Sequence, residues 1–415
     1  MPRGAEHWWE ERVQRAAHPL VYPLLSRLRR PAQRIPRVGV VVTDATVLRD
    51  VLLDTTRFTK TGPGASADLW TPILGPSVLL NMEGADHLAL RRLLGPLFAP
   101  AYVEELTRRT IGASMAALTE RLAAGERVDV VAEVRESAGQ VISRLVGLER
   151  DVMGAELFAR VSAVTGFVRL SRPRFTPAQV HQAREVLDDL TRHARTAYRA
   201  GDDTVPGRMR ALGLSEDEAM GAVGAFVLTG TETLVSYLPR MIAILADTGW
   251  LARLAADRTL LQPAIAEGLR VTTPSPVMLR SVAAEARVGG VQVHEGDRLV
   301  LATFLANRRA GQPVSRRAAR SMSHGKAGRR TPRPPGDTPP PFDPVGNPAA
   351  SLKQLWFGAG AHFCLGAPLA MAQIDLVLNA VLDAEARTPL QVTERRAQRG
   401  TLIPGYSRLV LAARG

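Results

Sequence analysis

The chain of 415 residues contains only one cysteine and few aromatic residues. A single cysteine cannot form a disulfide within the chain, which suits a reducing cytoplasm and leaves the thiol available for other chemistry. Aromatic residues make up 5% of the sequence, so the core has to be built mainly from Leu, Val and Ala. These residues recur with Arg and Glu at helical spacing, which favours helix over sheet for most of the length.

A secretory leader and a long apolar run are also missing. The N-terminal residues mix acids and bases, and they contain no apolar stretch followed by a cleavage site. The longest uncharged helical stretch, residues 219–231, is shorter than the roughly 20 apolar residues that cross a bilayer. We therefore expect a cytoplasmic protein that does not insert into a membrane.

The overall composition is that of an ordinary globular protein, with 46% hydrophobic and 22% charged residues. No flexible polar linker divides the chain, so we expect a single domain over residues 1–415. The net charge of +13 would suit nucleic acid, but no nucleic-acid-binding motif accompanies it. We expect no nucleic-acid partner.

The positive charge is concentrated in an irregular segment at residues 309–341. Between residues 308 and 337, nine Arg or Lys residues stand against one Asp, a local charge of +8, among many Pro, Gly and Ser residues. Such a composition buries too little apolar surface to offset the entropy of ordering, so a solvated loop is the simplest interpretation. Two hypotheses remain beside it, a loop that docks a partner and a local reading-frame error in a GC-rich gene.

Local signals predict the order of helices and strands. Asp44 or Thr43 caps a helix that follows a strand at residues 39–43. Ser215 and Glu218 form a capping box that opens a long apolar helix. The other expected elements are a Gly/Pro-rich loop at residues 61–84, a helix from Asp86 interrupted by Pro96, helices over most of 103–200, a helix from Pro263 that stops before Thr272, strands at 277–283, 286–293 and 298–305, and a last helix from just after Cys364 to about Ala386.

The most informative segment is residues 357–366, FGAGAHFCLG, where three glycines surround the cysteine directly before a helix. Glycines let the backbone approach a flat, bulky group and adopt left-handed conformations. The start of a helix supplies unpaired amides and a partial positive charge, which favour a thiolate at Cys364. Because a thiolate is a soft, electron-rich ligand, the segment predicts a metal site.

This segment resembles the cysteine-ligand loop of the cytochromes P-450, F-x-x-G-x-H-x-C-x-G. The resemblance implies that Cys364 binds the iron of heme b, as thiolates do in that family. It also implies that the backbone around the ligand contacts the cofactor at Phe357, Gly358 and Gly366. The resemblance runs from about Gly39 to the C-terminus and lapses only over the basic segment.

Weaker motifs of the same family follow in the expected order. Glu267 and Arg270 match its E-x-x-R pair, which is expected to lock the core behind the heme. Two heme propionates need several cations or donors, because buried carboxylates are costly unless they are paired. The residues that resemble the family's propionate ligands are His87, Arg91, Arg280 and His362.

The long central helix carries residues 228–233, LTGTET, which resemble the family's oxygen-activation pattern A/G-G-x-D/E-T. The resemblance implies that Gly230 leaves space against the heme and lets a hydroxyl and water enter the helix. Glu232 and Thr233 would pass protons to dioxygen. Thr229 stands beside the cofactor where Ala or Gly is usual, a departure that could alter proton delivery or pocket shape.

The resemblance implies a mainly α fold with a small β lobe, in which heme lies between the central helix and the cysteine-ligand loop. It implies a monomeric monooxygenase that inserts one atom of O2 into a lipophilic small molecule of secondary metabolism. Because no fused reductase is visible, the electrons would come from an acidic ferredoxin or flavodoxin-type donor with its reductase. Residues 61–84, 274–278 and 402–406 are mostly apolar and would line the pocket.

Two alternatives stay open within the same resemblance. One is an atypical heme-thiolate catalyst of oxidative coupling, desaturation or peroxide-driven oxidation, although Glu232 and Thr233 argue against peroxide dependence. The other is a catalytically silent scaffold, although that class tends to lose the ligand cysteine and Cys364 is present.

Overall fold

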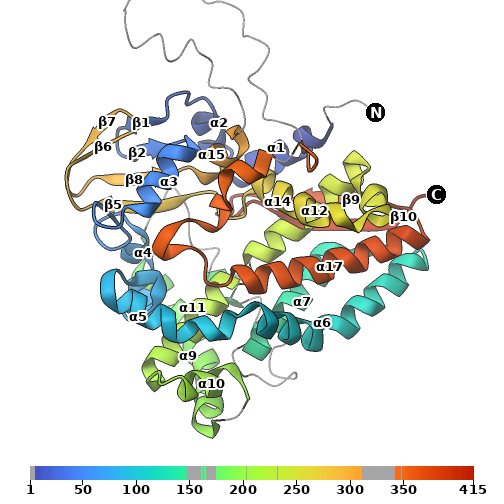
Figure 1. The fold of residues 1–415 in the computed structure, drawn as a ribbon, viewed down its shortest axis with the longest axis horizontal. Helices are drawn as coiled ribbons and strands as arrows, with labels where there is room; N and C mark the ends of the chain where they lie inside the picture. Colours follow the sequence, from blue (N-terminus) through green and yellow to red (C-terminus); the bar gives the residue numbers. More distant parts are fainter. Residues whose placement is uncertain are drawn as a thin grey trace, which may run out of the picture.

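The computed structural model describes residues 5–145, 147, 160–161, 163–164, 174–201, 203–230, 232–310, 342–346 and 348–415. Helices make up most of these residues, and a smaller lobe of strands lies to one side (Figure 1). The fold is therefore mainly α with a small β lobe, as predicted. Most of the basic segment at 309–341 lies outside the described residues.

The β lobe is built on one five-stranded sheet with the order β1-β2-β8-β5-β3. All neighbouring strands are antiparallel except β2 and β8, which are parallel. The valines of β2 are fully buried, which is typical of a strand covered on both faces. The first residue of this strand, position 39, has to be glycine, because a Cβ there would lie 2.3 Å from the carbonyl oxygen of Arg298. The strands are β1 (Ala32–Ile35), β2 (Gly39–Val42), β3 (Phe58–Thr59), β5 (Met278–Val282) and β8 (Arg298–Leu301).

Two consecutive helices, α11 (Glu216–Gly230) and α12 (Glu232–Thr248), run through the middle of the molecule (Figure 1). Other helices surround them: α1 (Ala5–Ala17), α5 (Gly84–Leu94), α6 (Pro100–Ala123), α7 (Val130–Leu145), α9 (Pro177–Ala200), α10 (Val205–Ala211), α13 (Trp250–Ala256), α14 (Leu261–Thr272) and α17 (Ala367–Arg387). The short helices α2 (Val21–Ser26), α3 (Ala45–Leu53), α4 (Ser66–Leu74) and α15 (Thr303–Arg309) accompany the β lobe, and β4 (Val128–Asp129), β9 (Leu390–Ala397) and β10 (Tyr406–Ala413) form a second sheet. The strands β6 (Ala286–Val288) and β7 (Val291–Val293) pair as a hairpin.

One large hydrophobic cluster joins these elements, from Val13 in α1 to Leu411 in β10. A smaller cluster around Tyr22, Val41 and Phe304 packs α2 and α15 against the main sheet. The segments that carry the sequence motifs are thus packed on a shared core.

Several predicted helix boundaries are confirmed. The Asp44 carboxylate accepts the amides of Thr46 and Val47 and so caps α3. Ser215 and Glu218 exchange the two bonds of a capping box before α11. The helix before Pro96 ends at Leu94, and α14 ends at Thr272.

Two other element predictions were wrong. The expected loop at residues 61–84 contains α4, because Leu69 and Ile73, one turn apart, bury one helical face despite the surrounding Gly and Pro. The expected strand at 298–305 ends at Leu301, and α15 begins two residues later. Periodicity could not detect this change, because every residue from Leu299 to Leu305 is buried.

Two helical stretches are long and apolar enough to cross a membrane by length and composition, residues Glu216–Thr248 and Ala367–Arg387. Both stretches contain charged residues, such as Glu232 and Asp375, so the prediction that the longest uncharged helical stretch is too short to cross a bilayer is not contradicted. The protein itself buries 65% and 61% of their most apolar windows, as in core helices of soluble proteins. The two helices are therefore weak evidence for membrane insertion.

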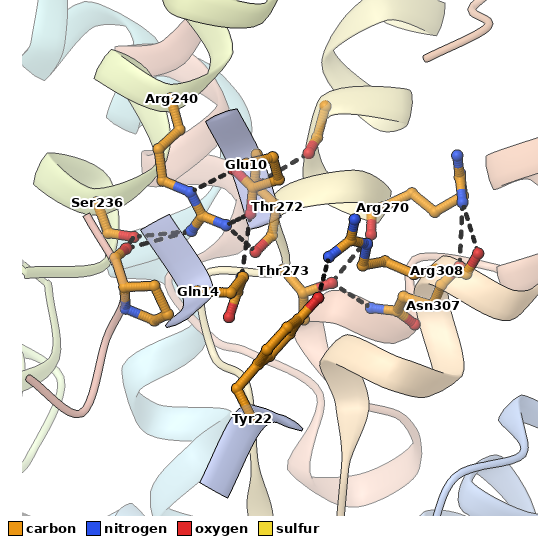
Figure 2. A network of polar contacts seen from close by, with 12 residues as sticks. Glu10, Gln14, Tyr22, Ser236, Arg240, Arg270, Thr272, Thr273, Asn307 and Arg308 are labelled. Carbon is orange, nitrogen blue, oxygen red and sulfur yellow. Dashed lines mark hydrogen bonds and ion pairs between the residues drawn. The ribbon is translucent and has the colours of Figure 1, made fainter. Parts of the chain in front are cut away.

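The Glu267–Arg270 pair lies completely inside the protein. Arg270 donates to both carboxylate oxygens, at 2.7 and 2.6 Å, and both side chains are fully buried. Figure 2 shows Arg270 beside Asn307 and Arg308, whose carbonyl oxygens accept from its other amino group at 3.3 Å. Glu267 also accepts the amide of Asp343 at 3.1 Å. Burial raises the pKa of Glu267, and the bonds from Arg270 oppose that rise. The pair therefore ties α14 to α15 and to the segment before the cysteine loop.

We expect the Arg270→Met substitution to lower the free energy of unfolding by about 3–5 kcal/mol, because it leaves a buried carboxylate without its cation. Urea unfolding followed by circular dichroism measures this change. Arg387→Met is the matched control, because Arg387 pairs with Glu120 on the surface, where the two side chains are 52% and 67% exposed. That control should lose less than about 1 kcal/mol. Equal losses in the two variants would contradict the structural role given to the buried pair.

Candidate functional site

The loop before α17 is shaped by two glycines and one backbone hydrogen bond. The amide of Cys364 donates to the carbonyl oxygen of Phe357 at 2.9 Å and closes the loop. Gly358 and Gly360 have φ values of 85° and 65°, which favour glycine. Gly366 has φ of −80°, so the expectation of a left-handed conformation was wrong at that position. Gly366 instead serves as the N-cap residue of α17, and a Cβ there would lie 4.0 Å from the Cys364 sulfur.

The Cys364 thiol is reached by solvent although protein surrounds it on most sides. A thiol can be both solvent-accessible and surrounded by protein when it faces an internal space that is open to solvent. Burial raises the pKa of Cys364, while bonds from the amides of Gly366 and Ala367 and the charge of Arg91 lower it. The helix start thus stabilises a thiolate as predicted, but burial outweighs it. A thiolate held here requires a further positive partner.

Basic side chains gather beside this thiol from four separate segments. The rings of His87 in α5 and His362 in the loop lie 4.2 Å apart between centroids. Arg280 comes from β5, and Lys60 follows β3 at the position opposite Arg280, because Thr59 pairs with Ser281. The charge of Arg91, one turn after His87, acts on Cys364.

Only one acid, Glu83, contributes to this cluster among the described residues whose charges act on it. His362 Nε2 and Glu83 Oε2 lie 2.6 Å apart. Glu83 also accepts the backbone amide of Lys60. Burial acts to raise the pKa of Glu83, but these bonds outweigh it and lower the pKa, so the carboxylate stays ionised.

The basic groups are consequently held in an environment that disfavours their charge. Burial, with the charge of Arg280, lowers the pKa of Lys60 to about 7. Burial and the neighbouring cations lower the pKa of His87 to about 4. Burial lowers the pKa of Arg280 to about 10. The cluster has an excess of positive charge and would be stabilised by an anion.

Two buried donor atoms in the cluster have no hydrogen-bond partner, Arg280 Nε and His362 Nδ1. An orphaned buried polar atom is costly, so these atoms indicate the place of a missing acceptor. Two carboxylates beside the cations, and a metal above the thiolate, would satisfy both halves of the site. The residues present therefore fit an iron porphyrin with its two propionates.

Sequence motifs found four members of the basic cluster but missed Lys60 and Glu83. Lys60 reaches Arg280 only through the register of β3 on β5, which connects residues 220 positions apart. Glu83 precedes α5 without capping it, and its side chain bonds to His362 instead. Neither role has a local signal in the sequence.

The predicted oxygen-activation residues lie where α11 ends and α12 begins. The Thr229 hydroxyl donates to Ala225 O at 2.7 Å, and the Thr233 hydroxyl donates to Thr229 O at 3.3 Å. The Thr229 side chain is exposed and those of Glu232 and Thr233 are half-buried, although most of the neighbouring helix is buried. Two hydroxyls and a carboxylate therefore remain accessible on an otherwise buried helix.

Gly230 lies against a neighbouring helix, whereas the prediction concerned the space that it leaves against the heme. A Cβ there would lie 2.9 Å from Cδ1 of Ile142 in α7. Glycine at this position therefore allows α7 to approach, and its predicted role beside the heme stays a prediction. An aromatic pair lies between α11 and the cysteine loop: Phe98 packs edge-on against Phe226 at 5.0 Å, and a Cβ at Gly366 would lie 4.0 Å from the Phe98 ring.

A search for groups of three or more His, Cys, Asp or Glu that could hold a metal ion finds none in the described part of the chain. Phe357, edge-on to Phe363 at 6.0 Å, also borders a cavity of about 420 Å³ between α14 and the segment before the loop.

Comparison with known proteins gives relatives of one kind. No protein-family model matches the chain. The chain is 28% identical over 364 residues to a C-19 steroid 1alpha-hydroxylase from Sorangium cellulosum, with 86% of each protein covered. It is 29% identical over 321 residues to cytochrome P-450 107B1 from Saccharopolyspora erythraea, covering 76% of this chain and 71% of that protein.

Among solved structures, the chain is similar to a cytochrome P-450 in complex with an acyl carrier protein that carries hexadec-9Z-enoic acid. That similarity has a TM-score of 0.76 at 18% identity and covers 97% of this chain and 99% of the other, so it shows the fold. The curated relatives supply what the fold alone does not, since they are named as hydroxylases and cytochromes P-450. The chain therefore has the cytochrome P-450 fold, and its sequence is similar to those of bacterial cytochrome P-450 hydroxylases.

Proposed function

We propose that the protein binds heme b and inserts one atom of O2 into a lipophilic small molecule of secondary metabolism. The observation that carries the proposal is the pairing of one accessible thiol, held by two helix amides, with a basic cluster that contains a single acid. When bound, the heme supplies the redox chemistry by which one oxygen atom enters the substrate and the other leaves as water.

In this proposal Cys364 is the iron ligand, and the backbone around it forms the floor of the cofactor site. The amides of Gly366 and Ala367 hold the thiolate in place. Gly358 lets the loop turn at a positive φ of 85°, a conformation that would strain any other residue. Phe357 would contact the cofactor, and its carbonyl oxygen closes the loop by accepting from the Cys364 amide.

The basic cluster is proposed to bind the two propionates. Arg280 Nε and His362 Nδ1 have free hydrogen-bonding capacity and are buried. Lys60 joins the set that the sequence predicts, because it lies beside Arg280 in the sheet register. Two carboxylates would restore the charged forms of these groups. The full set is Lys60, His87, Arg91, Arg280 and His362.

Thr233 and Glu232 are proposed to hold and pass protons at the oxygen side of the site. The bond from the Thr233 hydroxyl to Thr229 O is long, at 3.3 Å, so the hydroxyl can exchange it for water. Glu232 is half-buried, with access both to the protein and to solvent. Thr229 and Gly230 stay in the proposal as residues near the cofactor, although the packing of Gly230 supports a contact with α7 more directly.

The proposed substrate is lipophilic because the segments expected to line the pocket are largely apolar. They are residues 61–84, 274–278 and 402–406. The similarity to a steroid hydroxylase supports an apolar substrate of this kind. We also propose a monomeric, cytoplasmic, single-domain protein that receives electrons from an acidic ferredoxin or flavodoxin-type donor with its reductase, in keeping with the net charge of +13.

The Cys364→Ala substitution is expected to abolish the thiolate-type difference spectrum of the reduced, CO-treated protein, together with oxidative turnover. The thiolate is the only protein ligand proposed for the iron, so no other side chain can replace it. A wild-type spectrum of the imidazole-ligated type, or a protein that takes up no heme, would refute the proposed function.

The Arg91→Gln substitution is expected to speed heme loss by about tenfold to a hundredfold, because each charge-assisted bond contributes roughly 1.5–3 kcal/mol. Transfer of heme to excess apomyoglobin measures the rate. The neighbouring Arg92 is exposed, so Arg92→Gln is the matched control and should leave the rate within about twofold of wild type. A similar rate in both variants would count against propionate binding by the cluster.

The Thr233→Ala substitution is expected to lower product formed per NADPH consumed by on the order of tenfold, because general acid–base groups contribute at least that much. Peroxide release should rise in proportion. Thr248→Ala is the control, since the Thr248 hydroxyl makes the same kind of bond within α12, to Ile244 O at 2.7 Å. Unchanged coupling in Thr233→Ala would remove this residue from proton transfer.

A further inference from the structure

The N-terminal helix α1 is anchored inside the protein by one buried ion pair, Glu10–Arg240 (Figure 2). We propose that this pair fixes the positions of the two turns that line the substrate pocket. Residues outside the pocket would then determine how well large ligands bind. The inference rests on the proposed function, because the pocket is the one assigned there to residues 274–278 and 402–406.

Arg240 is fully buried, and each of its five N–H groups has an acceptor. Nε and Nη2 donate to the two carboxylate oxygens of Glu10. Nη1 donates to Ser236 Oγ at 3.3 Å and to Pro404 O at 3.2 Å, and Nη2 also donates to Thr272 O at 2.6 Å. The acceptors come from the N-terminal helix, from α12 itself, from the β9–β10 turn and from the end of α14. One guanidinium therefore fixes four segments relative to one another.

Among the described residues, hydrogen bonds anchor the turn between β9 and β10 to α12 and to the end of α1. Ser236 Oγ donates to Pro404 O at 2.6 Å. The amide of Gly400 donates to Ala16 O at 3.2 Å, and the His18 ring nitrogen lies 2.9 Å from Leu402 O. The turn is thus bound to the end of α1 on one side and to the Arg240 network on the other.

The second turn starts where α14 ends and leads to β5. Thr273 has φ of 40°, an uncommon value for a β-branched residue. Its hydroxyl donates to Arg270 O at 3.0 Å and accepts from Asn307 Nδ2 at 3.2 Å. Figure 2 shows this turn between the Arg240 and Arg270 networks. The strained conformation of Thr273 is therefore held from two sides. Its own hydroxyl makes the bonds on one side, and on the other Arg240 donates to the carbonyl oxygen of the preceding residue, Thr272.

The position of Arg240 on α12 connects both turns with the reaction site. Ser236 and Arg240 follow Thr233 by three and seven residues, so all three lie on about the same face of the helix. At 1.5 Å per residue, Arg240 is about 10 Å along the axis from Thr233. The face that presents the proposed proton-handling hydroxyl also carries the Arg240 network. A shift of that network would move the pocket walls relative to the cofactor.

Replacing Glu10 by Gln keeps the shape of the side chain but removes the charge that Arg240 needs in a buried setting. The guanidinium would then shift toward other acceptors or water, and the carbonyl oxygens of Pro404 and Thr272 would lose their fixed donor. We expect both turns to loosen while the cysteine loop, on a different part of the chain, keeps its geometry.

The test uses full-length holoenzyme and two nitrogen ligands of iron that differ in size, imidazole and clotrimazole. Both are titrated by the shift of the heme absorption band. In Glu10→Gln the dissociation constant of clotrimazole should change at least fivefold, while that of imidazole stays within twofold. The matched control is Glu11→Gln, because Glu11 pairs with Arg15 on the surface of the same helix. It should leave both constants within twofold. Equal changes for the two ligands, or none, would overturn the proposal.

A second measurement reports the turn directly. Hydrogen exchange of the peptide around residues 398–405 should become at least tenfold faster in Glu10→Gln and stay unchanged in Glu11→Gln, because the Gly400 amide bonds to α1. Should Glu10→Gln fail to fold, Ser236→Ala removes the hydroxyl that donates to Pro404 O and accepts from Arg240 Nη1, keeps the Glu10–Arg240 pair, and should shift the clotrimazole constant at least threefold.

General loss of stability is separated from positioning by Leu118→Ala, which opens a cavity in α6, away from both turns. If this variant changed the ratio of the two ligand constants as much as Glu10→Gln does, the positioning role would be refuted. Failure of the proposed function is distinguishable from all of these outcomes, since a wild-type protein without a thiolate-ligated heme would show it before any titration.

Discussion

The structure depends on the rule that a charge can be buried only with its partners. Arg240 and Arg270 lie in the interior without exposure to solvent, and each is surrounded by oxygen atoms. Their acceptors come from segments that are far apart in the sequence, as in the bond from Arg240 to Glu10. Because every donor of Arg240 is used, the guanidinium fixes distances that apolar packing alone would leave adjustable.

The site beside Cys364 is the opposite case, a set of charges that the chain itself does not balance. The register of β3 on β5 places Lys60 opposite Arg280. The single carboxylate of the cluster, Glu83, is already bonded to His362. The chain keeps such an arrangement because the core around it is fixed by other contacts. The proposed heme would supply two carboxylates to the cations and a metal cation to the thiolate, so its binding would be coupled to local stability.

The sequence predicts the parts of this protein that depend on neighbouring residues. The cysteine loop, the caps at Asp44 and Ser215, and the end of α14 each follow from a few adjacent residues. The sequence could not show α4 or α15, because their helical faces are defined by what packs on them. It could not show the roles of Lys60, Glu83 or Glu10 either, since each is given by a contact with a residue more than 200 positions away. Gly230 shows a third kind of limit: no local signal in the sequence indicates that α7 packs against it.

The seating of α1 has a consequence for the order of folding. Helix α1 precedes Arg240 by a long stretch of chain, and Pro404 lies further along still. During synthesis Glu10 is therefore made before the residues that complete its binding place, and α1 cannot take its final position until those later segments have assembled. A change that weakens the Glu10–Arg240 pair would act at this late step of folding.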